Sequence, residues 1–401
     1  MDFFDQQERA QRQTRLLICL FGIAVAVVVL VIYVFLASAI YVLRHPLISE
    51  AWWDPMTIII DGFFFLGGLL VQPFHTLKLI WDPQLALWTA VGTVLPILVG
   101  WFYKLRVLAA GGPAVAELLG GRRVDPESQN ADEQRLCHVI SEMAIASGMS
   151  QPVVYVLDRE RGVNSFAAGH TRDDVAIGVT LGCLKLLTRD ELQGVIAHEF
   201  SHILKGDTRL NMKLMALSHG LFWPTIVGRI LLCGNSAAPE MDDFNFDEDV
   251  PEISKPLLPL ALFFLLLGSV SSPLVRWIKS MICREREWLA DAAAVQFTRN
   301  PAGIEGALKK IGGLLKQGRL DTPHAESASH FYFVNCVYDS WFGFQSTHPP
   351  LPKRILRIDP QFDGKFEHIR SLPSHDAVYD LRYEESVRRM RAQAAAQPAQ
   401  E

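Results

Sequence analysis

The stretch "HEFSH" at residues 198–202 has the residue types and spacing of a metal site. His198 and His202 are four residues apart, which on an α-helix leaves their imidazoles about 40° apart in projection and one turn apart in height. Both rings can therefore reach one ion, and imidazole nitrogens suit zinc. The side chain of Glu199, next to His198, points in a different direction around the helix axis. We expect it to act as the general base that takes a proton from an attacking water and passes it to the leaving amine.

A catalytic zinc usually takes three protein ligands, so the chain must supply another one. The candidate lies in "REREWLADAAA", residues 284–294, where Glu287 and Asp291 are four residues apart on one face of a predicted helix. We assign Glu287 to the metal. Asp291 is expected to accept a hydrogen bond from the imidazole N–H of a ligand and so to fix its ring.

A helix over residues 187–203 would hold the two histidines. Thr188, with Glu191 three residues later, predicts a capping box at its start. Apolar residues then recur at helical spacing and predict a buried stripe, formed by Leu192, Val195, Ile196 and Ile203. Charged residues in and just after this helix are costly at bilayer depth, which argues against an intramembrane protease with the same motif; they are Asp190, Glu191, Lys205, Asp207 and Arg209.

Long apolar runs surround this region. Half of the 401 residues are apolar, and the formal charge is only −5 with scattered basic residues, so we set nucleic acid aside as a partner. We predict transmembrane helices at residues 16–43 and 85–103 and in both arms of a hairpin at 214–275. The hairpin encloses an acidic loop at 234–255, with seven acidic residues against one lysine. Residues 56–80 are apolar but interrupted, and they predict a segment that is re-entrant or lies at the membrane interface, or else a fifth crossing.

These spans divide the chain into a membrane region and a split soluble domain. Residues 1–103 form the N-terminal membrane region, and the hairpin returns the chain to its starting side, so that 104–213 and 276–385 form one domain. Residues 386–401 are predicted to be a disordered tail. Within the domain, β-branched residues predict strands at 151–158 and 173–180. The fold class is therefore α+β, mostly helical, with four transmembrane helices, or five if residues 56–80 cross.

Basic residues give this arrangement an orientation. They precede the first span at 9–15, follow the last N-terminal span at 104–123, and follow the hairpin at 276–286. By the positive-inside bias, the N-terminus and both parts of the split domain are predicted to be cytosolic. No organellar transit pattern precedes the first span, so a bacterial inner membrane is the expected location.

Four motifs together resemble the HtpX-type membrane zinc metallopeptidases, which belong to the gluzincin group and are related to the CaaX prenyl endopeptidases. They are HEFSH, the pair Glu287 and Asp291, "NSFAAG" at 164–169 and "STHPP" at 346–350. The resemblance covers residues 110–360 and implies a split cytosolic catalytic domain of the gluzincin type. It implies the same ligands, base and supporting carboxylate that the spacing indicates.

The resemblance adds two further expectations. It implies an edge strand that pairs with an extended substrate peptide, formed by Asn164, Ser165, Phe166, Ala167 and Ala168. It also implies that His348 lies at the cleft and donates a hydrogen bond to the tetrahedral intermediate. From the residues alone, 164–168 could be a turn leading into a strand, and His348 could cap the helix that follows it.

We therefore expect a membrane-bound zinc endopeptidase with one Zn²⁺ per chain, whose partners are the lipid bilayer and polypeptide substrates. The resemblance implies that these substrates are membrane or misfolded proteins and that the enzyme serves protein quality control. Two alternatives stay open. One is a CaaX-type prenyl peptide endopeptidase, and the other is a non-catalytic membrane scaffold with a structural zinc site. The sequence indicates no oligomeric state.

Overall fold

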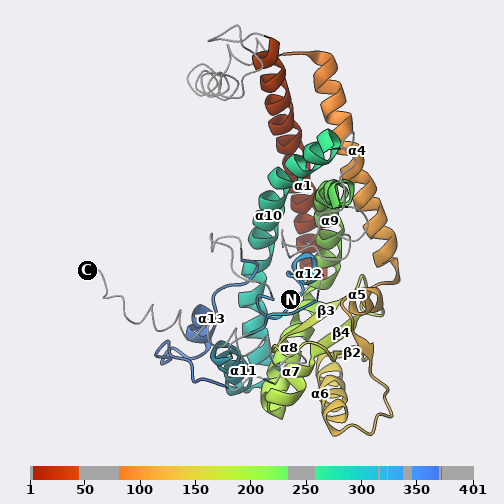
Figure 1. Ribbon diagram of the computed structural model, residues 1–401. Coiled ribbons are helices and arrows are strands. Elements are labelled where there is room, and N and C mark those ends of the chain that lie inside the picture. The colour runs from red at the N-terminus through yellow and green to blue at the C-terminus, as the bar shows by residue number, and fades with distance from the viewer. Residues whose placement is uncertain are drawn as a thin grey trace, which may run out of the picture. The chain divides into compact units, whose positions relative to one another are not determined.

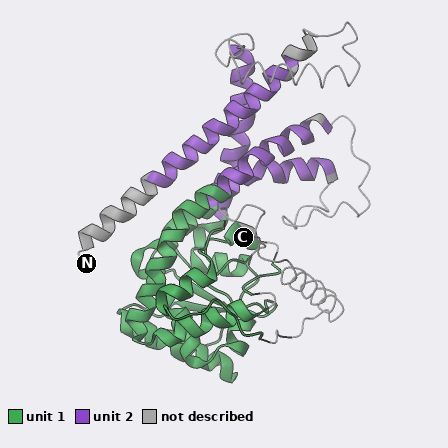
Figure 2. Cartoon of the chain, turned by 90° about the vertical axis from the view of Figure 1, so that its left-hand side faces the viewer, with its two compact units in different colours: residues 1–10, 107–215, 276–401 green, residues 11–106, 216–275 purple. Residues whose placement is uncertain are grey.

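The computed structural model (Figure 1) describes residues 3–44, 81–233, 258–314, 317–322, 324–336, 346–369 and 372. Three features expected from the sequence lie outside these residues: the apolar segment at 56–80, the acidic loop at 234–255 and the tail at 386–401. The chain forms two compact units (Figure 2). Unit 1 comprises residues 1–10, 107–215 and 276–401, and unit 2 comprises residues 11–106 and 216–275.

Unit 2 is built from long apolar helices. They are α1 (Phe3–Arg44), α4 (Pro83–Val107) and parts of α9 (Asp207–Cys233) and α10 (Leu258–Thr298). Among the described residues, four segments are long and apolar enough to cross a membrane: Leu16–Ser38, Pro83–Ala110, Asp207–Leu232 and Leu260–Thr298. They coincide with the spans expected at 16–43, 85–103 and in the arms of the hairpin. The prediction of four candidate membrane helices is therefore confirmed, and the segment at 56–80, which could be a fifth, lies outside the described residues.

Small residues let the helices of unit 2 approach closely. A Cβ atom at Gly100 of α4 would lie 2.3 Å from the Cβ atom of Trp223 in α9, so only glycine fits this crossing. The outward faces of α1 and α4 expose large apolar side chains, among them Leu30, Phe35 and Trp88. Such faces are suited to contact with lipid rather than water.

Unit 1 contains one four-stranded sheet in the order β1-β2-β4-β3. The strands are β1 (Arg122–Arg123), β2 (Val153–Leu157), β3 (Ser165–Ala168) and β4 (Ala176–Thr180). The central strands β2 and β4 are parallel, in a register that pairs Val153 with Ala176, and both outer strands are antiparallel to their neighbours. The strands expected at 151–158 and 173–180 are these two central strands, which explains their near-continuous β-branched and apolar character.

Unit 1 also contains several helices, most of which form one core with this sheet. They are α5 (Gly112–Leu118), α6 (Ala131–Ser147), α7 (Leu181–Leu186), α8 (Arg189–Lys205), α11 (Pro301–Gly313), α12 (Ala325–Ala328) and α13 (Leu351–Ile358), with a 3₁₀ turn at Leu108–Ala110. The core joins α6, the sheet, α8 and α11 through side chains such as Leu136, Val156, Ile177, Ile196 and Ile304. A mostly helical fold with a small mixed sheet confirms the predicted fold class.

Candidate active site

Helix α8 carries the first three residues of the site. It begins with the capping box expected from the sequence: Thr188 Oγ1 accepts a hydrogen bond from the Glu191 N–H, and the Glu191 carboxylate accepts one from the Thr188 N–H. The apolar stripe at Leu192, Val195, Ile196 and Ile203 is buried in the core of unit 1. The capping box fixes the start of the helix, and the buried stripe fixes its rotation about its own axis. The face that carries His198 and His202 is therefore held in one orientation.

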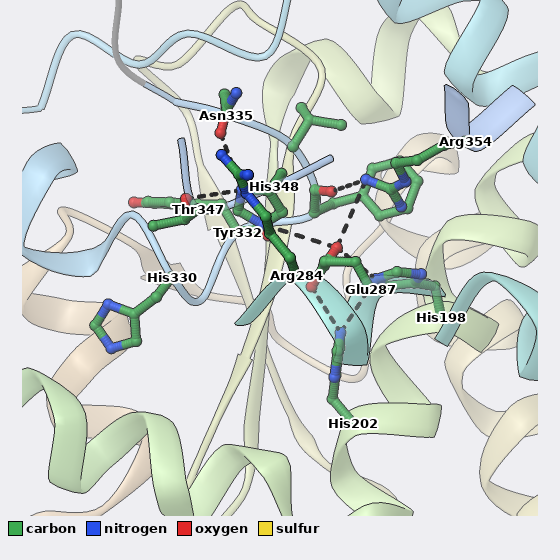
Figure 3. Close-up of polar contacts among 12 residues, drawn as sticks. His198, His202, Arg284, Glu287, His330, Tyr332, Asn335, Thr347, His348 and Arg354 are labelled. Carbon is green, nitrogen blue, oxygen red and sulfur yellow. Dashed lines mark hydrogen bonds and ion pairs between the residues drawn. The ribbon is translucent and has the colours of Figure 1, made fainter. Parts of the chain in front are cut away.

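That face and α10 together place three ligand atoms at one point (Figure 3). His198 Nε2 lies 3.1 Å from His202 Nε2, and the two carboxylate oxygens of Glu287 lie 3.5 and 3.4 Å from these nitrogens. All three residues are buried, and their ligand atoms lie within 4.8 Å of one another. The structure thus brings together the three residues that the sequence assigned to the metal.

The chemistry of this cluster fits zinc. Two imidazole Nε2 atoms that face each other at 3.1 Å repel unless a proton or a cation lies between them. Glu287 Oε2 is buried and has no hydrogen-bond partner among the residues that the structure describes. Two histidines and a carboxylate are one of the ligand sets found in catalytic zinc sites, where a fourth position stays open.

Glu199 lies next to the cluster and is fully buried. The Ser165 hydroxyl of β3 donates a hydrogen bond of 2.6 Å to its Oε1, whereas its Oε2 lacks a partner within the described part of the chain. Burial raises the pKa of the Glu199 carboxyl. Sequence reasoning did not connect Ser165 with this carboxylate, since the contact depends on how β3 packs against α8.

Asp291 lies one turn beyond Glu287 on α10 and faces His198. Its Oδ1 is 3.0 Å from His198 Nδ1, the ring nitrogen that points away from the ligand cluster. Both of its oxygens also accept hydrogen bonds from Arg354 of α13, at 2.8 and 2.6 Å. Arg354 has no exposed surface and lies over the Phe333 ring, 4.6 Å from its centroid. The sequence showed Arg354 only as one of several basic residues in a short amphipathic helix, so its burial was missed.

His348 is also buried beside the cluster, 3.8 Å from Glu287. Its Nε2 lies 2.5 Å from the Tyr332 carbonyl oxygen and its Nδ1 2.9 Å from Thr347 Oγ1. Burial lowers the pKa of His348 to about 4, so the ring is neutral at pH 7. The alternative role as a helix cap receives no support, since α13 begins after Pro350 and no side chain among the described residues caps it.

The segment expected to bind substrate forms β3, at the end of the sheet. Ser165, Phe166, Ala167 and Ala168 are in the strand and buried, and Asn164 immediately precedes it. The outer edge of β3 is paired with the same chain: Phe166 forms an antiparallel bridge with Tyr332, and the Phe333 N–H donates to the Ser165 carbonyl at 2.9 Å.

Asn164 fixes this pairing from one end. Its side-chain oxygen accepts hydrogen bonds from the backbone N–H groups of Phe333 and Val334. Its side-chain nitrogen donates to the carbonyls of Gly318 and Val334. Asn164 is therefore a structural anchor as well as the residue before the strand. The run of aromatic and β-branched residues "FYFV" at 331–334 was the sequence signal for this additional strand-like segment.

Comparisons with known proteins agree with this geometry. The model of peptidase family M48 matches residues 130–361. A protein named "Protease HtpX homolog" from Ligilactobacillus salivarius is 30% identical over 304 residues, which are 75% of this chain and 95% of that protein. Its namesake from Streptococcus gordonii is 30% identical over 297 residues, 72% of this chain and 94% of that protein.

A solved structure, that of S. mikatae Ste24p, is similar at a TM-score of 0.35 and 18% identity; the match covers 76% of this chain and 63% of that one, less than two thirds of its length. The family of this chain is given by the family model and by the HtpX homologs. The match over more than half of the chain, together with the His-His-Glu cluster and the four apolar helices, shows that the chain belongs to peptidase family M48 and is a membrane zinc metallopeptidase.

Proposed function

We propose that this peptidase binds one zinc ion through His198, His202 and Glu287 and hydrolyses peptide bonds of membrane or misfolded proteins in protein quality control. The observation that carries the proposal is the buried convergence of three ligand atoms next to a buried glutamate. Zinc, when bound, would polarise the scissile carbonyl and make an attacking water more acidic.

Glu199 is the proposed general base. It lies one residue from His198 and keeps one carboxylate oxygen, Oε2, without a partner among the described residues. Its other oxygen is held by Ser165, so the carboxylate cannot rotate freely. Because burial raises its pKa, the carboxyl group is better suited both to accept the proton of the water and to release it to the leaving nitrogen.

His348 is proposed to donate a hydrogen bond to the oxygen that gains charge during the reaction. In this structure its Nε2 points at the Tyr332 carbonyl oxygen, which shows that an oxygen acceptor can occupy this position near Glu287. A neutral imidazole carries one N–H. The Tyr332 carbonyl oxygen can only accept a hydrogen bond, so the proton is on Nε2, and Nδ1 can accept a hydrogen bond from the Thr347 hydroxyl. An oxyanion of the substrate in the place of this carbonyl would receive the same hydrogen bond.

The outer edge of β3 is proposed to bind the substrate in an extended conformation. Residues 332–334 already pair with this edge, which supports its capacity to accept an antiparallel strand. A peptide that binds along Asn164 to Ala168 must therefore replace this segment or continue the pairing beyond it. The buried Ser165 would then connect the substrate strand with the base, since its hydroxyl contacts Glu199.

The proposed location is a bacterial inner membrane, with the catalytic domain, formed by residues 104–213 and 276–385, in the cytosol. The support is the set of four apolar helices and the basic residues that flank them in the sequence. Membrane or misfolded proteins are suitable substrates, since a chain without stable structure readily offers an extended segment to a strand edge.

The test is cleavage by the full-length protein, purified in detergent with a chelator and then supplied with zinc. The wild type is expected to cut an unfolded model protein, whereas Glu199→Gln is expected to bind one zinc per chain and not to cut. Glu127→Gln, at an exposed position, is the matched control and should behave as the wild type. Cleavage by Glu199→Gln would contradict the assignment of the base. Cleavage of a prenylated peptide alone would favour the CaaX-type alternative.

A further inference from the structure

The second zinc histidine has a carboxylate partner that its motif does not include. His202 Nδ1 lies 3.0 Å from Oδ2 of Asp207, within hydrogen-bond distance. The other oxygen, Oδ1, lies 2.9 Å from Nη1 of Arg286. The side chains of Asp207 and Arg286 are only 6% and 8% exposed, so this ion pair is shielded from water. Arg286 directly precedes the zinc ligand Glu287 in the sequence.

A break in the helix makes this contact possible. On one unbroken helix, residues five apart are about 140° apart in projection, so Asp207 would point away from His202. The helix instead ends at Lys205, and Gly206 adopts a left-handed conformation with φ of 75° before α9 begins at Asp207. This turn brings the carboxylate back over the imidazole. No atom lies within 4 Å of a Cβ built at Gly206, so the backbone conformation and not the space requires glycine.

A carboxylate lies 3.0 Å from Nδ1 of each histidine, and the contact at His202 has the geometry of a hydrogen bond. His198 faces Asp291, which is bound by Arg354, and His202 faces Asp207, which is paired with Arg286. In each case a buried carboxylate is neutralised by a buried arginine. An acceptor at Nδ1 keeps the ring proton on that nitrogen, so that the lone pair of Nε2 is directed at the metal.

We propose that Asp207 is a positioning residue for zinc, which fixes the tautomer and the orientation of His202, and that Arg286 holds Asp207 in place. The proposal depends on the zinc site of the proposed function. Since Arg286 and Glu287 are adjacent on α10, one turn of this helix provides the third ligand and also secures the second. The corner between α8 and α9 would thus be part of the metal site.

Zinc affinity of the full-length protein tests the proposal, measured by competition with a chromogenic chelator and zinc alone. Asp207→Asn is expected to weaken binding by roughly 10- to 100-fold. The single amide oxygen would be drawn to Arg286, which turns the NH₂ group towards His202 Nδ1 and forces the ring proton onto Nε2. Asp207→Ala removes the acceptor without imposing the wrong tautomer and should weaken binding less, because the volume vacated by the carboxylate can hold a water molecule that accepts from Nδ1.

A larger loss of zinc affinity with asparagine than with alanine separates a positioning role of Asp207 from a structural one. A carboxylate that served only the fold would make alanine, which is further from aspartate in shape, the more harmful change. Asp190→Asn, on α8 with His202 but with a side chain that is 63% exposed, should leave zinc affinity unchanged. Zinc binding by Asp207→Asn within twofold of the wild type, or a larger loss with alanine, would overturn the proposal. A wild type that binds no zinc would overturn the proposed function instead.

Gly206→Ala keeps every side chain of the site and provides a second test if the Asp207 variants do not fold. Alanine is strained at φ of 75°, so the corner should shift and zinc binding should weaken several-fold. Gly148→Ala is a matched control, because Gly148 ends α6 with φ of 66° and also has no atom within 4 Å of its Cβ position. Equal zinc affinities for these two variants would contradict a role of the corner in the metal site.

Discussion

The two units of the molecule treat polar and apolar side chains in opposite ways. Unit 1 buries oppositely charged residues next to one another, as in the ion pair between Asp291 and Arg354. Unit 2 places large apolar side chains such as Leu95 and Phe102 on its surface. Burial of a charge is costly unless it is paired, and exposure of an apolar face is costly only in water. Unit 1 thus has the features of a fold that holds a polar site, and unit 2 those of apolar helices suited to lipid.

Removal of a charged partner in unit 1 should have the largest effect. Arg354→Met leaves the Asp291 carboxylate buried without its two hydrogen bonds, which is expected to lower the free energy of unfolding by about 3–5 kcal/mol. Thermal unfolding in detergent measures this loss. Arg357→Met on the same helix is the control, since Arg357 is exposed and lies over the Trp288 ring, and it should cost about 1 kcal/mol or less. Equal losses would mean that the burial of Arg354 contributes nothing.

The ion pair between Asp291 and Arg354 also shows where sequence reasoning ends. Glu287 and Asp291 could be assigned because a spacing of four puts two side chains on one helical face, and the same rule identified His198 and His202. Arg354 comes from another helix, and nothing in its local pattern separates a buried arginine from an exposed one. Its role follows only from tertiary packing.

Asp207 illustrates a different limit. Its distance of five residues from His202 points to the wrong side of an unbroken helix, so the spacing rule excludes it. Gly206, directly before Asp207, is a residue type that commonly ends a helix. If the helix is taken to end there, the spacing rule no longer applies to Asp207. Membrane helices, in contrast, could be predicted well because a bilayer selects for apolar length, which is a property of the sequence alone.

An arginine introduced on the surface of each unit should distinguish a surface in lipid from a surface in water. Leu95 in the middle of α4 and Ile145 on α6 are both exposed, at 58% and 82%. Leu95→Arg is expected to cost about 2.5–3.5 kcal/mol because the guanidinium would enter the hydrocarbon, whereas Ile145→Arg should change stability by about 0.5 kcal/mol or less. The fraction of each chain that is recovered folded from the membrane gives the comparison. Similar recovery of the two variants would argue against a lipid environment for α4.

Removal of a neutral partner in unit 1 should have the smallest effect, and it should appear in the pH profile. Ser165→Ala deletes the hydroxyl that donates to Glu199 Oε1, and this hydrogen bond favours the charged carboxylate. Its loss therefore raises the pKa of Glu199 further above its ordinary value. A base must be deprotonated to act, so the acidic limb of kcat/KM should move to higher pH.

The pH dependence of the loss distinguishes an effect of Ser165 on the ionisation of Glu199 from an effect on the position of the strand. Within the acidic limb, a decrease of about tenfold in kcat/KM is expected, which corresponds to about 1.4 kcal/mol. At high pH, where Glu199 is ionised in both proteins, the two rates should converge. Ser141→Ala removes a hydroxyl that donates to the Cys137 carbonyl on α6 and should leave the profile unchanged. A loss of rate that is equal at every pH would instead mean that Ser165 acts by positioning the strand, since the ionisation of Glu199 would then be independent of its hydroxyl.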